Sequence, residues 1–331
     1  MTTSSFPALL QGYFMDRLLG QFGASPHTVA GHRDMFRLLL RFAATRMGRA
    51  PSEVRLEDLD ASFVSAFLDH LEAERGNCTR TRNTRLAALR TFFRYVALCQ
   101  PDYALQCQRV LAIPTKRHQR SQVEFLSEEE SDALVAAPDQ GTWIGRRDHT
   151  LLLLAIQTGL RNSELRWLKH RDVELGTGSH VRCLGKGRKM RCTPLQPDVA
   201  EVVKRWMAEQ GGGAEDPFFP SSRGGSLSAD ALQRLVRRHA ATAGETCPTL
   251  AGKRVTPHTL RHTTAMSLLW RGVDLTVIAL WLGHESTETT QIYLHADMRL
   301  KEQALAHASP TGLPPERFEP TDGLIEFLES L

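Results

Sequence analysis

The sequence of 331 residues lacks several features that define common classes of protein. Its six cysteines form no CxxC pair, which argues against a structural zinc site and against a disulfide framework. The longest apolar stretch, residues 151–156, is far too short to cross a bilayer. The N-terminus has no basic region followed by a long apolar segment, so we expect no signal peptide. These absences predict a cytoplasmic protein without a membrane span.

The sequence also lacks a phosphate-cradling GxxxxGK[ST] loop and a cluster of carboxylates. His258 and His262 have the HxxxH spacing of a zinc-binding helix. However, Thr259 stands where such helices carry a glutamate, and no third ligand stands out. We therefore expect neither a metal ion nor a cofactor.

Charge is distributed unevenly along the chain, although the net charge is only +4. Residues 1–120 hold 17 Lys and Arg against 10 Asp and Glu, whereas residues 294–331 hold 3 against 7. Residues 75–101 contain six arginines and no acid. Surface helices normally mix both signs, so this helix is predicted to lie along a nucleic-acid backbone; a merely solvated basic face is the alternative. The predicted DNA contacts are Arg80, Arg82, Arg85, Arg90, Arg94, Lys116, Arg117 and Arg120.

The chain divides at residues 113–124, a basic segment without periodicity that we interpret as a linker. Residues 1–112 are predicted to form a helical domain that binds DNA. Its helices begin at Ser25-Pro26, at Asp60 and at Thr79 or Thr81. The last of these is expected to bury one apolar seam, formed by Leu86, Leu89, Phe93 and Val96.

Residues 125–309 are predicted to form a second, catalytic domain, which opens with a capping box from Ser127 to Glu130. One buried helix is expected over residues 147–156. Further helices are expected from residues 162, 197, 228, 257, 273 and 286, and a β-hairpin over residues 180–195. Residues 310–331 then form a proline-rich connector and a short amphipathic helix from Gly323 to Leu331.

Five short motifs follow one another in the second domain. They are TGLRNSEL around Arg161, GKGRKMR around Lys186, HTLRHT around His258 and Arg261, LGH ending at His284, and TQIYLH around Tyr293. In this order and spacing, across residues 125–300, the chain resembles the tyrosine recombinase (phage integrase) family. The first domain resembles the core-binding domain of that family more loosely. The resemblance implies a mainly helical fold, with a helical SAM-like domain followed by a catalytic domain that carries a small antiparallel hairpin or sheet.

The resemblance also implies how a phosphodiester is attacked. Tyr293 is the nucleophile, and Arg161 and Arg261 bind the non-bridging oxygens of the phosphate, since guanidinium groups bind oxyanions through paired hydrogen bonds. His258 and Arg261, three residues apart on a helix that starts at Pro257, face the same side. His258 is the expected base. Taken singly, Arg161 could instead pair with Glu164, and Tyr293 could be an ordinary packed aromatic residue.

Two further side chains complete the expected site. Lys186, at the tip of the hairpin, is the expected general acid for the leaving 5′ oxygen, in preference to the nearby Lys189. His284 is expected to add a hydrogen bond to an oxygen of the phosphate or to the attacking group. His262 is expected to pack or to form a hydrogen bond in support of Arg261.

The function implied is site-specific DNA recombination or integration without metal or ATP, through a 3′-phosphotyrosyl intermediate, a 5′-hydroxyl and a Holliday junction. The implied partners are double-stranded DNA with an inverted-repeat site and three further copies of the chain, a homotetramer on two duplexes in the nucleoid. The C-terminal helix is expected to dock in trans. A topoisomerase of type IB and a catalytically silent DNA-binding regulator are the alternatives. The sequence leaves open whether the biological role is integration, transposition or resolution, and it does not identify the target site.

Overall fold

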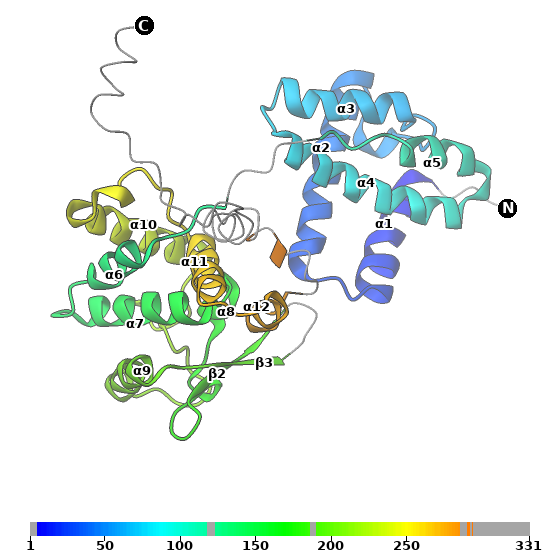
Figure 1. Cartoon of the computed structure of the whole chain (residues 1–331). Helices are drawn as coiled ribbons and strands as arrows, with labels where there is room; N and C mark the ends of the chain where they lie inside the picture. The colour runs from blue at the N-terminus through cyan, green and yellow to red at the C-terminus, as the bar shows by residue number, and fades with distance from the viewer. Residues whose placement is uncertain (1–4, 118–122, 186–189, 285–289, 292, 294–331) are drawn as a thin grey trace, which may run out of the picture. The chain divides into compact units, whose positions relative to one another are not determined.

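The computed structural model describes residues 5–117, 123–185, 190–284, 290–291 and 293, which fall into two compact units, residues 1–120 and residues 121–331. The described residues are mainly helical, with a small antiparallel sheet in the second unit (Figure 1). Within the described residues, no helix is both long enough and apolar enough to cross a membrane.

The first unit is a bundle of helices. In chain order these are α1 (Phe6–Gly12), a π-helical segment (Tyr13–Gln21), α2 (Pro26–Met47), α3 (Ala61–Ala73), α4 (Thr79–Cys99) and α5 (Ala104–Leu111), with short 3-10 turns at Pro51–Glu53 and Pro101–Tyr103. The predicted starts of α2 and α3 are confirmed. Ser25 Oγ accepts a hydrogen bond from the Thr28 amide, and Asp60 Oδ1 accepts one from the Phe63 amide.

The core of the first unit is assembled around α4. All four residues of the predicted seam are buried, and Phe92 is buried as well. The ring of Phe92 packs edge-to-face on Tyr13 and Phe36, with ring centroids 5.3 and 5.0 Å apart. Tyr13 belongs to the N-terminal pair of helices, which the sequence analysis did not predict.

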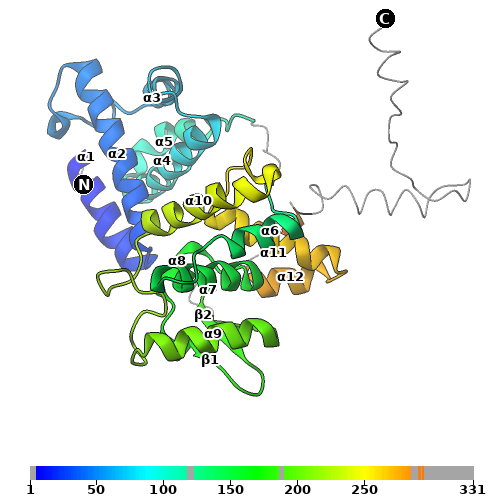
Figure 2. The same cartoon turned by 90° about the vertical axis from the view of Figure 1, so that its left-hand side faces the viewer.

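The second unit is built on a central helix. Its helices are α6 (Glu128–Ala136), α7 (Trp143–Thr158), α8 (Asn162–Trp167), α9 (Pro197–Gln210), α10 (Ala229–Thr246), α11 (Pro257–Trp270) and α12 (Leu275–Leu282), with 3-10 turns at His170–Asp172 and Pro248–Leu250. Helix α11 packs against α7, α10 and α12 (Figure 1). Helix α7 also contacts α6 and α9, and both views show α9 beside it (Figure 2). The predicted capping box is confirmed, since Ser127 and Glu130 exchange hydrogen bonds.

The predicted hairpin is confirmed as β2 (His180–Leu184) and β3 (Met190–Pro194), paired antiparallel with Val181 opposite Thr193 and Leu184 opposite Met190. A strand of two residues, β1 (Val173–Glu174), pairs with β2 and gives the sheet order β1-β2-β3. No pattern in the sequence predicted β1. Strand β3 also contacts α12. The sheet therefore lies beside the segment that leads to His284.

Candidate active site

Helix α11 carries three of the candidate side chains on its first two turns. Thr256 caps the helix, because its Oγ1 accepts a hydrogen bond from the Thr259 amide, and Pro257 supplies a favourable first residue. His258, Arg261 and His262 follow within five residues of this fixed start. The N-terminal end of a helix favours anions, so these side chains extend from a suitable place for a phosphate.

Arg261 is almost completely buried, with 2% of its surface exposed. Its Nη1 donates to the Gly159 carbonyl at 2.7 Å, and its Nη2 donates to the Leu282 carbonyl at 2.6 Å. Burial, assisted by the charge of Arg161, lowers its pKa to about 10. Arg261 therefore remains a cation at neutral pH and is held in place by the C-terminal ends of α7 and α12.

Arg161 lies immediately before α8 and is joined to the same place. Its Nη2 donates to the carbonyl of Gly283 at 2.6 Å, and its Nη1 donates to Glu164 Oε1 at 2.9 Å. The carbonyls of residues 282 and 283 are consecutive in the chain, so Arg161 and Arg261 are anchored side by side. The pairing of Arg161 with Glu164, which the sequence analysis considered as an alternative to a catalytic role, is present together with this convergence.

Glu164 is held by a second arginine that the sequence analysis did not select. Nη1 and Nη2 of Arg191, on β3, donate to the two carboxylate oxygens at 2.8 and 2.7 Å. Burial tends to raise the pKa of Glu164, but hydrogen bonds from Arg191 and the charges of both arginines outweigh it and lower the pKa. Arg191 therefore ties the hairpin to the Arg161 anchor. Its place as the last residue of the GKGRKMR motif was the available signal.

Tyr293 is buried, with 1% of its surface exposed, and packs against apolar side chains of α11 and α12. Its Oη lies 2.9 Å from Nδ1 of His262, and the two atoms share a hydrogen bond. Burial raises the pKa of the phenol to about 12, although the charge of Arg261 works in the opposite direction. The expectation that His262 supports only Arg261 is therefore incomplete, because this imidazole contacts the candidate nucleophile itself.

Two other histidines, His258 and His284, lie beside the contact between His262 and Tyr293. His258 is exposed, and its ring centroid lies 4.3 Å from that of the half-buried His262. The ring of His284 is stacked on that of Tyr293, with centroids 6.5 Å apart, and its Nδ1 shares a hydrogen bond of 2.8 Å with Thr290 Oγ1. Burial and the nearby cations lower the pKa of His262 and of His284 to about 4, so both are neutral at pH 7.

The structure thus brings together five of the six predicted catalytic residues. Lys186 and its competitor Lys189 lie outside the described residues, and their assignment stays a prediction. Within the part of the chain that the structure describes, no group of three or more His, Cys, Asp or Glu residues could hold a metal ion.

The predicted DNA contacts divide into groups. Arg80, Arg94, Lys116 and Arg117 are exposed, Arg85 and Arg90 are half-buried, and Arg120 lies outside the described residues. For Arg82 the predicted exposed position is wrong: only 4% of its surface is exposed, and its Nη1 donates to the Pro114 carbonyl at 3.0 Å. Arg82 turns inward because it holds the start of the predicted linker against α4, where Asn83 also exchanges hydrogen bonds with Lys116.

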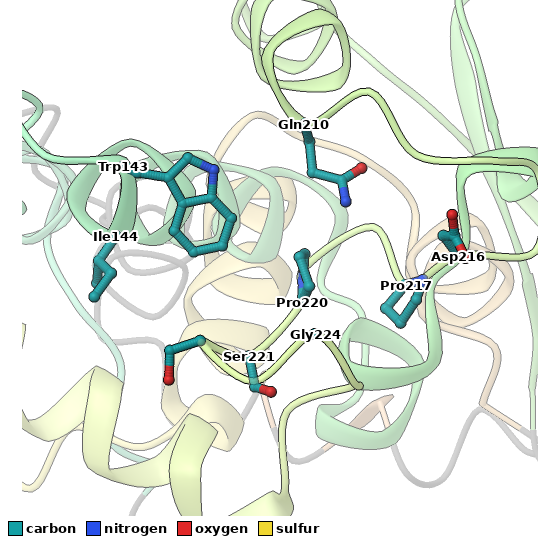
Figure 3. A pocket seen from close by; sticks show the side chains of 9 residues that line it. Trp143, Ile144, Gln210, Asp216, Pro217, Pro220, Ser221 and Gly224 are labelled. Atoms are coloured by element: carbon teal, nitrogen blue, oxygen red, sulfur yellow. The ribbon is translucent and has the colours of Figure 1, made fainter.

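A cavity of about 540 Å³ lies elsewhere in the second unit, between the start of α7 and the end of α9. Figure 3 shows Trp143 and Ile144 on one side of it, with Gln210, Pro217 and Ser221 around the remainder. None of the candidate catalytic residues lines this cavity, so it has no part in the chemistry described above.

Comparisons with known proteins show the family of the chain. A family model described as "Phage integrase family" matches residues 124–299, and one described as "Phage integrase, N-terminal SAM-like domain" matches residues 12–98. The chain is 51% identical over 328 residues to "Putative integrase/recombinase y4rC" of Sinorhizobium fredii (strain NGR234), covering 99% of each protein. It is 33% identical over 293 residues to "Tyrosine recombinase XerC" of Pelobacter propionicus, covering 88% of this chain and 92% of that one.

Among solved structures, the fold is similar to that of the XerH site-specific recombinase bound to palindromic difH substrate in a post-cleavage complex. The TM-score is 0.69 at 23% identity, and the match covers 86% of this chain and 80% of the other.

Proposed function

Because this chain belongs to the phage integrase family of tyrosine recombinases, we propose that it is a site-specific DNA recombinase in which Tyr293 attacks the scissile phosphate. The observation that supports this most strongly is the anchoring of Arg261 and Arg161 on the consecutive carbonyls of residues 282 and 283, because Leu282 belongs to the same apolar cluster as Tyr293. Two cations held side by side next to a phenol suit a reaction that builds negative charge on a phosphorus centre.

In the proposed cleavage step, Tyr293 Oη forms a bond to phosphorus while the bond from phosphorus to the 5′ oxygen breaks. Arg161 and Arg261 bind the non-bridging oxygens, and Lys186 gives a proton to the departing 5′ oxygen. His284 contributes a hydrogen bond beside the nucleophile. The 3′-phosphotyrosyl linkage conserves the energy of the phosphodiester, so a 5′-hydroxyl of another duplex can displace the tyrosine without ATP. The arginines supply the positive charge, and we propose no role for a metal.

The buried phenol makes a proton acceptor necessary. The pKa of Tyr293 is about 12. Forming the phenolate at pH 7 before the attack on phosphorus would therefore cost roughly 7 kcal/mol. A general base that removes the proton during the attack avoids most of this cost.

The proposed substrate is double-stranded DNA with an inverted-repeat site, and the proposed assembly is a homotetramer on two duplexes, since a complete exchange requires four strand cleavages. Arg80, Arg94, Lys116 and Arg117 are the exposed candidates for the DNA backbone. Residues 322–331 lie outside the described residues, and we propose that they dock on a neighbouring subunit. Deleting them should impair pairing of two sites and spare binding to one; unchanged recombination would rule out this role.

The proposed function is tested by strand exchange between two duplexes that carry different labels. The DNA beside the gene would first be searched for short inverted repeats, and both duplexes would carry that sequence. We expect joint products with wild-type protein and none with Tyr293→Phe. A topoisomerase of type IB would form the covalent adduct without joining the two labels. A silent regulator would bind the site and form no adduct that resists denaturation.

A further inference from the structure

The hydroxyl of Tyr293 shares a hydrogen bond with His262, which is not one of the six residues that the motifs assign to catalysis. The two rings meet at 66°, with centroids 5.5 Å apart, and His262 Nδ1 lies 2.9 Å from Oη. His262 follows Arg261 directly on α11, so the helix that places a phosphate-binding cation also places this imidazole against the nucleophile.

The two histidines of the HTLRHT motif, His258 and His262, differ in their exposure to solvent. His258 is exposed, as expected for a group that meets DNA at the surface of the site. His262 is half-buried behind it, between the ring of His258 and that of Tyr293. A base must be within hydrogen-bond reach of the proton that it removes, and His262 meets this requirement before any substrate is bound.

We propose that His262 is the general base of the cleavage step, in place of His258. This inference rests on the proposed function. In the tautomer that carries its proton on Nε2, Nδ1 accepts the hydrogen bond from the phenol. As the bond from Oη to phosphorus forms and the bond to the 5′ oxygen breaks, the phenolic proton passes to Nδ1. During religation the imidazolium returns this proton to Oη as the tyrosine departs from phosphorus.

The surroundings keep His262 in the form that can accept a proton. Burial lowers its pKa to about 4, and the groups that face it are His258 and Arg261 on its own helix, His284 after α12, and Tyr293. The pKa values of imidazole and phenol are far apart in the free protein. The transfer must therefore accompany formation of the phosphorus bond.

The same contact could instead serve as a latch that keeps Tyr293 away from DNA, and the two roles predict opposite results. A duplex nicked beside the scissile phosphate traps the covalent adduct in a single turnover. His262→Asn is the informative variant, because its amide can hold the phenol in place but cannot take a proton. We expect this variant to form the adduct about 10²- to 10⁴-fold more slowly than wild type at pH 7.

The pH dependence separates a base from a structural residue. Between pH 6 and 9 the wild-type rate should be nearly constant, because His262 stays neutral there. The His262→Asn rate should rise toward about tenfold per pH unit, because hydroxide then takes the proton. His258→Asn is the matched control. It should lower the rate of adduct formation by the same factor at every pH. DNA affinity and melting temperature, measured for each variant, report whether the fold is retained.

The assignment is overturned if His262→Asn cleaves as fast as wild type or faster, or if its loss of rate is the same at every pH. It is also overturned if the rate of adduct formation rises with pH in His258→Asn and not in His262→Asn. Failure of the wild-type protein to form any adduct would refute the proposed function itself, and the inference with it.

Discussion

At the scale of single residues, the site depends on a buried carboxylate as much as on its cations. Glu164 accepts hydrogen bonds from both Arg161 and Arg191, and these arginines come from different elements of the second unit. Buried charges are tolerated only when they are paired, because each one loses its hydration on folding. Glu164 therefore fixes the geometry of Arg161 and also stabilises the fold.

We expect Glu164→Gln to destabilise the protein by about 3–5 kcal/mol at pH 7, because it leaves a buried guanidinium without its counterion. The folded-state pKa of Glu164 is lowered, so its stabilising contribution is present above the unfolded value of about 4.5 and is lost as the pH falls through the folded pKa. Urea unfolding of wild type and variant should therefore converge at acidic pH.

Glu209→Gln is the control for this prediction, since Glu209 pairs with Arg146 at a partly exposed position. It should have a much smaller effect, because solvent screens such pairs. Equal losses from the two substitutions would contradict the role given to Glu164.

At the scale of elements, two helix ends build the anchor for the arginines. Helices α7 and α12 both end in a glycine in the left-handed conformation, Gly159 and Gly283, each with φ of 63°. A Cβ on Gly159 would lie 2.6 Å from Cδ2 of Leu282, whose carbonyl accepts a hydrogen bond from Arg261. The close approach of these ends brings the carbonyls of residues 159 and 282 to the same guanidinium.

The C-terminal glycines of α7 and α9 provide a matched pair of substitutions. Gly211, with φ of 65°, has nothing within 4 Å of an added Cβ, so Gly211→Ala should cost only the backbone strain of about 1–2 kcal/mol. Gly159→Ala adds a clash of roughly 1–3 kcal/mol and displaces the Arg261 anchor. Denaturant unfolding and single-turnover cleavage should show a larger loss of stability for Gly159→Ala, with slower adduct formation in that variant alone. Equal behaviour would show that the helix ends do not position the arginine.

Local patterns in the sequence predicted the capped elements of the fold well. Ser25, Asp60 and Ser127 begin helices as expected, because a side-chain cap is a signal confined to a few residues. The helices over residues 6–21 were missed because Ser5 makes no side-chain cap, although Phe6, Leu9 and Tyr13 are buried at helical spacing. Strand β1 was missed because two residues show no periodicity.

Such local patterns did not predict contacts between residues that lie far apart in the sequence. Motif order indicated the chemistry of Arg161, Arg261 and Tyr293. It did not indicate that Tyr293 bonds to His262, 31 residues away, or that Arg82 bonds to a carbonyl 32 residues further along the chain. Both contacts depend on how helices pack, which spacing along the sequence does not specify.

At the scale of the whole molecule, the arginines of α4 fall into two sets that differ in exposure. Arg80 and Arg94 are exposed, whereas Arg82 is buried and fixes the start of the predicted linker. An exposed arginine that contacts a DNA phosphate releases a counterion on binding, so its loss changes how affinity depends on salt.

We therefore expect Arg94→Ala to weaken DNA binding and to reduce the slope of log affinity against log salt by about one. Arg82→Met should lower the melting temperature and leave that slope unchanged. Binding titrations at several salt concentrations measure both. A reduced slope for Arg82→Met, or an unchanged slope for Arg94→Ala, would refute this division of roles.

In the proposed reaction, Tyr293 becomes joined to DNA within a site organised by Arg161 and Arg261. The most direct test of this reaction is to trap the protein on a nicked duplex that carries its site, digest the adduct with protease and nuclease, and identify the modified peptide by mass spectrometry. We expect a nucleotide joined through its 3′-phosphate to Tyr293 in the wild type, and its loss in Tyr293→Phe and in Arg261→Ala. A modification on another residue, or an adduct that persists in Tyr293→Phe, would contradict it.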